Sequence, residues 1–165
     1  MSDRSQTTDI AFTPAVRAMQ ERLGTRAQMA AMAQRRGFRT EITPDLTAFI
    51  GQCESFFLAT ATAQGQPYIQ HRGGPAGFLE VVGPRSLRFN DLPGNRQFVT
   101  LGNLSENDRV HLFLIDHETR TRIKIWGRGR VLDPGGDRRI EIAVTAWDPN
   151  CPQHIPLRFS EATVN

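Results

Sequence analysis

The sequence FFLAT (residues 56–60) decides the fold class, because this short apolar run leads directly into a turn and a second extended segment. The turn is AQGQ (residues 63–66), and the second segment is PYIQHR (residues 67–72). Two extended runs on either side of a glycine-containing turn predict a β-hairpin. We therefore expect an antiparallel β structure from residue 55 onward.

Further extended segments follow at close spacing, at residues 78–82, 87–90, 109–116 and 122–132. Six short strands separated by turns favour an antiparallel β-barrel over a parallel sheet. A helix is expected from Asn95 to Leu101, between two of the strands, and a short helix at residues 137–143. The proline-containing segment 147–156 predicts neither helix nor strand.

Helices are expected before the first strand. Thr13-Pro14 and Thr43-Pro44 each place a capping hydroxyl before a proline, and proline is favoured at the first helical position. After the second signal, apolar residues recur at helical spacing, at Leu46, Phe49, Ile50 and Cys53. Residues 26–36 are rich in Ala, Met, Gln and Arg and predict further helix, which Gly37 ends.

Length and composition predict a single globular domain, since 165 residues with 39% apolar and 22% charged side chains are typical of one. We expect a helical segment at about residues 12–54, a barrel at about 55–133, and a helix with a tail at 134–165. No apolar run approaches the roughly 20 residues that a membrane-spanning helix needs. Residues 1–9 lack a secretory signal pattern, so a cytoplasmic protein without a membrane partner is expected.

Several common mechanisms are not indicated by the sequence. Cys53 and Cys151 form no CxxC pair, and Cys53 is expected in the core. The four histidines lack ligand spacing, so no metal site is predicted. The sequence also lacks a Walker motif, a GxSxG elbow and a dinucleotide fingerprint, which disfavours a Rossmann cofactor site.

The basic residues are nearly all arginine, with Lys124 the only lysine, and the sequence pI is about 9.5. This bias has two interpretations: a genome that favours arginine codons, or guanidinium groups that bind phosphate through paired hydrogen bonds. The arginines are scattered along the chain rather than clustered with aromatic residues. The sequence therefore predicts no nucleic-acid partner.

The turn DLPGNRQ (residues 91–97) follows a predicted strand and precedes the helix expected at Asn95. Free backbone N–H groups and the positive end of a helix dipole suit a phosphate at such a turn, and Arg96 adds a charged fork. The alternative interpretation is a surface helix capped by Asn95 with an exposed arginine. Local sequence leaves both open.

Two other stretches carry candidate ligand contacts. In HRGGP (residues 71–75) the glycine pair lets a flat ligand approach the main chain, or it is a plain turn beside a solvated His-Arg pair. RIKIWGRGRV (residues 122–131) alternates with period two, which predicts either a cofactor-facing or a solvated face. The residues of that face are Arg122, Lys124, Trp126, Arg128 and Arg130.

Taken together, these stretches resemble the pyridoxamine 5'-phosphate oxidase-like family over about residues 12–156. The segments that carry the resemblance are FFLATATAQGQPYIQHRGGPAGFL (56–79), LRFNDLPGNRQ (87–97), LGNLSENDRVHLFLID (101–116), RIKIWGRGRV (122–131) and WDPNCPQHIP (147–156). The resemblance implies a six-stranded antiparallel split β-barrel with flanking helices, an α+β fold that binds flavin mononucleotide (FMN). It also implies a homodimer with FMN in a cleft between the subunits.

The resemblance further implies a set of cofactor-binding residues. One group lines the flavin, lies beneath its ring or grips its phosphate: Gln70, His71, Arg72, Asn90, Asp91, Asn95 and Arg96. The other group faces the cofactor from the dimer region or covers it from the partner subunit: Trp126, Arg128, Trp147, Gln153 and His154.

Two functions of different classes follow from the resemblance. In the first, the protein is an FMN-dependent oxidoreductase of unspecified substrate, in which the flavin carries the hydride or electron chemistry and no amino-acid nucleophile is needed. In the second, the barrel is a non-catalytic module that binds or senses FMN, a deazaflavin or haem. Haem would favour an axial histidine, His71 or His154. The basic and aromatic C-terminal ending of true pyridoxamine phosphate oxidases is not found, which leaves the vitamin B6 reaction open.

Overall fold

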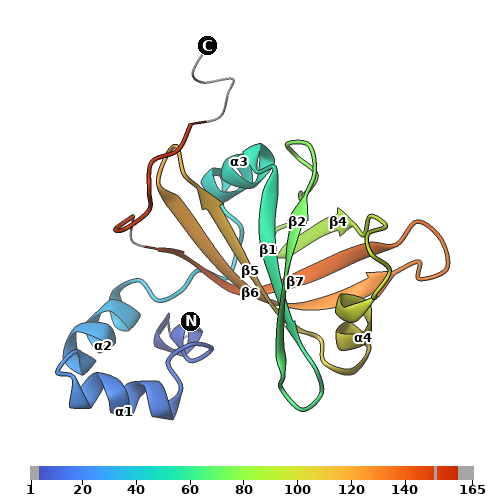
Figure 1. The fold of residues 1–165 in the computed structure, drawn as a ribbon. Helices are drawn as coiled ribbons and strands as arrows, with labels where there is room; N and C mark the ends of the chain where they lie inside the picture. The colour runs from blue at the N-terminus through green and yellow to red at the C-terminus, as the bar shows by residue number, and fades with distance from the viewer. Residues whose placement is uncertain (1–3, 151, 160–165) are drawn as a thin grey trace.

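A computed structural model describes residues 4–150 and 152–159, and these ranges contain one curled antiparallel sheet (Figure 1). The strands are β1 (Ser55–Ala61), β2 (Pro67–Gly73), β3 (Glu80–Gly83), β4 (Ser86–Asn90), β5 (Arg109–Asp116), β6 (Thr121–Leu132) and β7 (Arg139–Asn150). Their order is β2-β1-β5-β6-β7-β4-β3, which leaves β2 and β3 as edges. The sheet is therefore an open barrel of seven strands rather than the six expected, because β7 was not predicted, and the predicted antiparallel split-barrel class is confirmed.

Two of the helices, α1 and α3, begin where the Thr-Pro capping signals predict them. The helices are the 3₁₀ helix η1 (Arg4–Thr8), α1 (Pro14–Arg22), α2 (Arg26–Arg35), α3 (Pro44–Gln52) and α4 (Val99–Glu106). The hydroxyls of Thr13 and Thr43 accept hydrogen bonds of 3.3 Å from the N–H groups of Val16 and Leu46. Each cap satisfies a donor that the first helical turn leaves free. Within the described ranges, no helix has the length and hydropathy to cross a membrane.

The core forms between the inner faces of the curled strands, with α3 packed against one end. Alternate residues of each long strand point inward, as period two requires, and on β6 these are Ile123, Ile125, Gly127 and Gly129. Side chains that are almost completely buried include Phe56, Leu58, Leu87, Phe89, Leu112, Leu114, Ile125, Ile140 and Ile142. Burying one such side chain contributes about 1.5–3 kcal/mol.

The helix expected at residues 137–143 is wrong, because residues 139–143 are the start of β7. Ile140, Ile142 and Val144 are buried, while Glu141 and Ala143 between them are not. β7 pairs with β4 on one side and β6 on the other, so this alternation fills the core from a strand shared by both. Segment 147–156 is not wholly irregular either, since β7 extends to Asn150. Pairing across the sheet therefore overrides local helix preference.

The helix expected to begin at Asn95 begins instead at Val99. The Asn95 side-chain oxygen accepts a hydrogen bond of 3.1 Å from the Gln97 N–H, which makes a local turn rather than a helix cap. Phe98 precedes the helix in the left-handed region, with φ of 54° and no capping hydrogen bond from its side chain. Residues 91–98 therefore form a loop that leads into α4.

Cys53 lies in the core, as predicted, at 9% exposure. Its thiol donates to the Phe49 carbonyl at 3.3 Å. Burial, assisted by the charge of Asp116, raises the pKa of Cys53 to about 11. The thiol therefore stays protonated and unreactive near neutral pH. Cys151 lies outside the described residues.

The N-terminal unit, defined here as residues 4–39, packs on the outside of β6 and β7. The ring of Phe38 stacks on that of Trp126, with centroids 5.1 Å apart and planes at 9°. The Phe38 N–H donates to the Thr7 hydroxyl at 2.8 Å, and Arg39 exchanges backbone hydrogen bonds with Trp147. Figure 1 shows α1 and α2 projecting from the body of the barrel on the side away from α4.

Gly127 lies at a register shift between β6 and β7. A substitution there tests how closely the two strands pack. A Cβ atom there would lie 2.7 Å from the Ala143 carbonyl oxygen and 2.8 Å from the Ile142 Cγ2. We expect Gly127→Ala to lower the free energy of unfolding by about 1–3 kcal/mol, measured by urea denaturation. The control Gly135→Ala meets no atom within 4 Å, and a change within about 0.5 kcal/mol is expected there. Equal stability of the two variants would contradict the packing described for Gly127.

Candidate functional site

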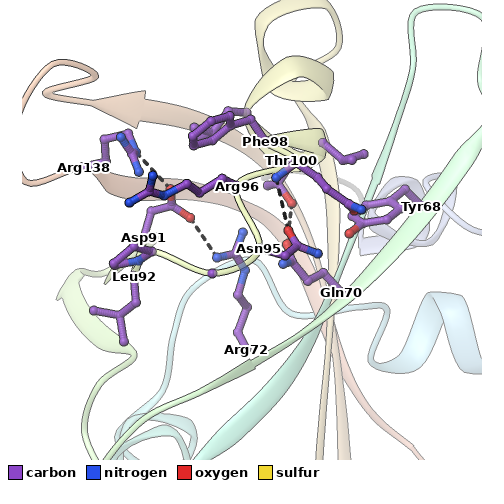
Figure 2. A pocket seen from close by; sticks show the side chains of 15 residues that line it. Tyr68, Gln70, Arg72, Asp91, Leu92, Asn95, Arg96, Phe98, Thr100 and Arg138 are labelled. Atoms are coloured by element: carbon purple, nitrogen blue, oxygen red, sulfur yellow. Dashed lines mark hydrogen bonds and ion pairs between the residues drawn. The ribbon is translucent and has the colours of Figure 1, made fainter.

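A pocket of about 440 Å³ opens at the seam between β2 and the loop of residues 91–98 (Figure 2). Its other walls are the first residues of α4 and Arg138, which directly precedes β7. The seam is the place where the edge strand β2 faces the loop after β4 without pairing to it. Side chains from segments distant in sequence therefore meet there. Such a concave meeting point of several elements is typical of a small-ligand site.

The strand β2 presents one of its faces to the pocket. Tyr68, Gln70 and Arg72 are half-buried on this face, while the residues between them are exposed on the other. The Thr100 hydroxyl donates to the Gln70 side-chain oxygen at 2.8 Å and so joins α4 to β2. Because this oxygen is already occupied, the Gln70 amide is left with its N–H groups to offer a ligand.

The carboxylate of Asp91 is held between two guanidinium groups at the pocket wall. Arg72 Nη1 lies 2.8 Å from one carboxylate oxygen, and Arg138 Nε lies 3.2 Å from the other. The side chains of Asp91 and Arg72 are only 9% and 12% exposed. We call these three residues the Asp91 cluster. One carboxylate cannot neutralise two arginines, so the Asp91 cluster keeps a positive charge.

Aromatic rings support both arginines of the Asp91 cluster. Arg72 lies over the ring of Phe89 and Arg138 over that of Phe98, each 5.5 Å from the ring centroid. Cation–π contact of this kind adds about 0.5–1 kcal/mol at exposed sites and more when desolvated. The guanidinium planes are therefore oriented before a ligand arrives.

The loop of residues 91–98 brings a third arginine to the pocket in a strained conformation. Arg96 and Phe98 both have positive φ, at 58° and 54°. Left-handed backbone at non-glycine residues costs about 1–3 kcal/mol and concentrates at functional sites. The Arg96 side chain is exposed and, among the residues that the structure describes, no ion pair to it is formed. Figure 2 shows it reaching across the pocket.

The charges around the pocket favour a dianion. Its lining contains three arginines and one aspartate, which leaves two positive charges. Arg72 Nε is buried and has no hydrogen-bond partner within the described part of the chain. Buried donors are nearly always paired in proteins, so this one indicates a ligand or water oxygen as its natural partner. Oriented guanidinium groups with neutral polar neighbours are the donors that bind phosphate.

The structure brings five of the predicted site residues together at this pocket: Gln70, Arg72, Asp91, Asn95 and Arg96. Asn90 ends β4 beside them and lines a neighbouring hollow with Arg139. Arg138 was missed by the sequence analysis because residues 137–143 were interpreted as a helix. The strand-like alternation IEIAV after Arg138 and Arg139 was the signal that could have placed it.

The other predicted residues lie away from the pocket in the same chain. His71 projects from the opposite face of β2, with its ring 5.6 Å from that of Phe57. Arg128 forms a paired, exposed interaction with Asp108 at 2.7 and 2.9 Å. The Trp147 indole is buried and donates to the Glu41 carbonyl at 2.8 Å.

The last two predicted residues lie in the segment after β7. The Gln153 carbonyl accepts a hydrogen bond from Arg122, and His154 is exposed with φ of 63°. The histidines suggested as haem ligands, His71 and His154, are thus on different parts of the surface. Whether either contacts a cofactor stays a prediction.

Two predicted residues, His71 and Trp126, belong to one continuous surface, the outer sheet face, on β2, β1, β5 and β6. Cross-strand pairing aligns its members in two rows: His71, Phe57, Phe113 and Lys124, and Ile69, Ala59, His111 and Trp126. Burial, assisted by the charge of Lys124, lowers the pKa of His111, so the imidazole is neutral at pH 7. This surface is apolar and aromatic along most of its length. Its most exposed large apolar side chain is Ile69, at 62%.

Residues 42–153 match the family model described as pyridoxamine 5'-phosphate oxidase. Because the match covers more than half of the chain, the protein belongs to this family. The matched region does not include the N-terminal unit. No curated protein gave a significant match to the sequence.

Solved structures with the same fold include HupZ from Group A Streptococcus, at 16% identity and a TM-score of 0.54, over 72% of this chain and 99% of that one. A putative pyridoxamine 5'-phosphate oxidase from Lactobacillus delbrueckii has 15% identity and a TM-score of 0.53, over 67% and 95%. A conserved hypothetical protein from Mycobacterium tuberculosis has 14% identity and a TM-score of 0.52, over 75% and 95%. At these identities the likeness establishes the split-barrel fold alone.

Replacing Asp91 tests whether the pocket is an anion site. Asp91→Ala leaves two partly buried cations without a counter-ion, and we expect the free energy of unfolding to fall by about 3 kcal/mol in chloride buffer. Inorganic phosphate should restore part of this loss, because it can replace the carboxylate. The control Asp108→Ala breaks an exposed pair with Arg128 and should cost less than about 1 kcal/mol, without rescue by phosphate. Equal phosphate responses in the two variants would contradict the assignment.

Proposed function

We propose that the pocket holds the phosphate end of FMN and that the protein is a homodimeric, FMN-dependent oxidoreductase. The observation that carries the proposal is the Asp91 cluster, in which a carboxylate orients two arginines at the open seam of a split barrel. Membership in the pyridoxamine 5'-phosphate oxidase family supports a flavin-type cofactor at this barrel.

The residues present fit the phosphate of FMN. A phosphate monoester carries about −1.5 to −2 charge at pH 7, which matches the two positive charges left over in the pocket lining. The buried, unpartnered Nε of Arg72 supplies a donor for one phosphate oxygen. Arg96, on an exposed loop, can close over the phosphate as a second charged fork.

The chain's own residues then have distinct tasks. Arg72, Arg96 and Arg138 bind the phosphate, and Asp91 keeps two of these guanidinium groups oriented. Tyr68 and Gln70, farther along β2, offer donors to the sugar-alcohol and ring portions of the cofactor. When bound, the flavin supplies hydride or electron transfer, and the protein supplies orientation and electrostatics.

A second subunit completes the proposed site. The outer sheet face is the surface through which we propose that two chains associate, since its exposed apolar side chains need cover. The partner subunit contributes residues that lie away from the pocket in their own chain, namely His71, Trp126, Arg128, Gln153 and His154. Trp147, buried in its own subunit, anchors the segment that carries Gln153 and His154.

Arg96→Ala tests the phosphate contact without disturbing the fold, because the side chain is exposed. Loss of a charge-assisted hydrogen bond removes about 1.5–3 kcal/mol, so the Kd for FMN should rise about 10- to 100-fold in a fluorescence titration. Riboflavin lacks the phosphate, and its Kd should not change. The control Arg130→Ala removes an exposed arginine paired with Glu141 outside the pocket. Unchanged FMN affinity in Arg96→Ala would count against the phosphate assignment.

A turnover assay distinguishes the proposed oxidoreductase from a non-catalytic binding module. The FMN-loaded protein is incubated with NADH and with NADPH, with oxygen as acceptor, and donor oxidation is followed at 340 nm as in standard assays. Steady donor consumption above that of free FMN supports the oxidoreductase. Bound flavin without turnover across a wider donor panel would favour the module, and a haem absorption band would overturn both flavin assignments.

A further inference from the structure

The helix α1 and its C-terminal cap residue carry an apolar stripe that the described chain covers only in part. Val16, Met19 and Leu23 recur at helical spacing and are 38%, 44% and 68% exposed. None of the nine residues of α1 is buried. A helix this short is marginal in water by itself, and most helical stability in proteins comes from packing of an apolar face. The stripe is therefore a surface built for contact.

Apolar exposure is concentrated on two adjoining surfaces. Eleven large apolar side chains are strongly exposed in the described residues; four belong to the N-terminal unit and two to the outer sheet face. The four are Ile10, Val16, Met19 and Leu23.

The N-terminal unit is continuous with the outer sheet face. Phe38 stacks on Trp126, and the row of cross-strand pairs that starts at Trp126 ends at the exposed Ile69. Ile10 lines a hollow of about 400 Å³ together with Trp126. A partner molecule that covers the outer sheet face therefore contacts the N-terminal unit as well.

The outer sheet face is too small to hold two chains together by itself. These four strands are at least seven residues long. At a spacing of about 4.8 Å, seven residues of each span only about 450 Å² in plan. A standard interface buries about 800 Å² on each partner. The N-terminal unit, which projects beside this face in Figure 1, provides the additional surface.

We propose that α1 is a dimerisation arm, whose stripe of Val16, Met19 and Leu23 packs against a second copy of this chain. The second copy is the occupant because the N-terminal unit, which carries the stripe, adjoins the outer sheet face through Phe38 and Ile10, and because that face needs more area. The proposal rests on the homodimer proposed above. It adds that a segment outside the family match, residues 4–39, sets the strength of association.

The test compares two carboxylates placed on different faces of α1 in the full-length chain. Met19→Glu puts a charge on the stripe, and Ala18→Glu puts the same charge about 100° around the helix, also at an exposed position. Dimer Kd is measured by analytical ultracentrifugation, with circular dichroism to establish that both variants are folded. We expect Met19→Glu to raise the dimer Kd at least about 10-fold and Ala18→Glu to leave it near the wild-type value.

The outcomes separate the arm from the dimer on which it rests. If the wild-type protein is a dimer and Met19→Glu associates equally well, the arm is overturned and the homodimer stands. If the wild-type protein is a monomer at all concentrations, both are overturned. Ile69→Glu, on the outer sheet face, provides the second check, since it should weaken association even if α1 makes no contact. Binding of the wild-type protein to phosphatidylserine vesicles that Met19→Glu abolishes, with an unchanged dimer Kd, would assign the stripe to a lipid surface and overturn the arm.

Discussion

The carboxylate of Asp91 is the interaction on which the candidate site depends. It accepts from Arg72 on β2 and from Arg138 before β7, and its own N–H donates to the Arg138 carbonyl at 2.8 Å. These contacts join the two sides of the open seam where strand pairing ends. A buried ion pair contributes little net stability once the cost of desolvation is counted. Its value here is orientation, since it presents two guanidinium groups to the same pocket.

The barrel provides this arrangement through the position of β7. Because β7 pairs with both β4 and β6, the start of β7 lies beside the end of β4, and Arg138 therefore meets Asp91 across 47 residues of sequence. The buried residues of β7, Ile140, Ile142 and Val144, fix the register that places Arg138 at the seam. Core packing and site geometry are thus consequences of the same strand.

Local sequence predicted the elements whose signals are local. The Thr-Pro caps located α1 and α3, and period-two alternation located β5 and β6 at almost their observed bounds. The start of β7 was mistaken for a helix because its strand character depends on two neighbours distant in sequence. Asn95 has a typical capping side chain, but it closes a turn two residues ahead of it instead.

Site residues that lie in local turns and strands could be predicted from the sequence, whereas those placed by pairing between distant segments could not. The turn of residues 91–97 and the strand of Gln70 and Arg72 were identified from the sequence, and the structure brings them to one pocket. The alternation after Arg138 indicates a strand, but its contact with Asp91 was not predictable, because that contact exists only through pairing of β4 with β7. The second group of predicted residues, from Trp126 to His154, lies away from the pocket in a single chain, so their contribution depends on a second subunit.

The absorption spectrum of the purified protein tests the central claim most directly, after incubation with FMN and removal of free ligand by gel filtration. The account predicts a retained flavin spectrum, with close to one FMN per chain, that is lost when riboflavin replaces FMN at the same concentration. A colourless protein, or equal retention of riboflavin, would contradict it, because the arginines around Asp91 would then not be holding a phosphate.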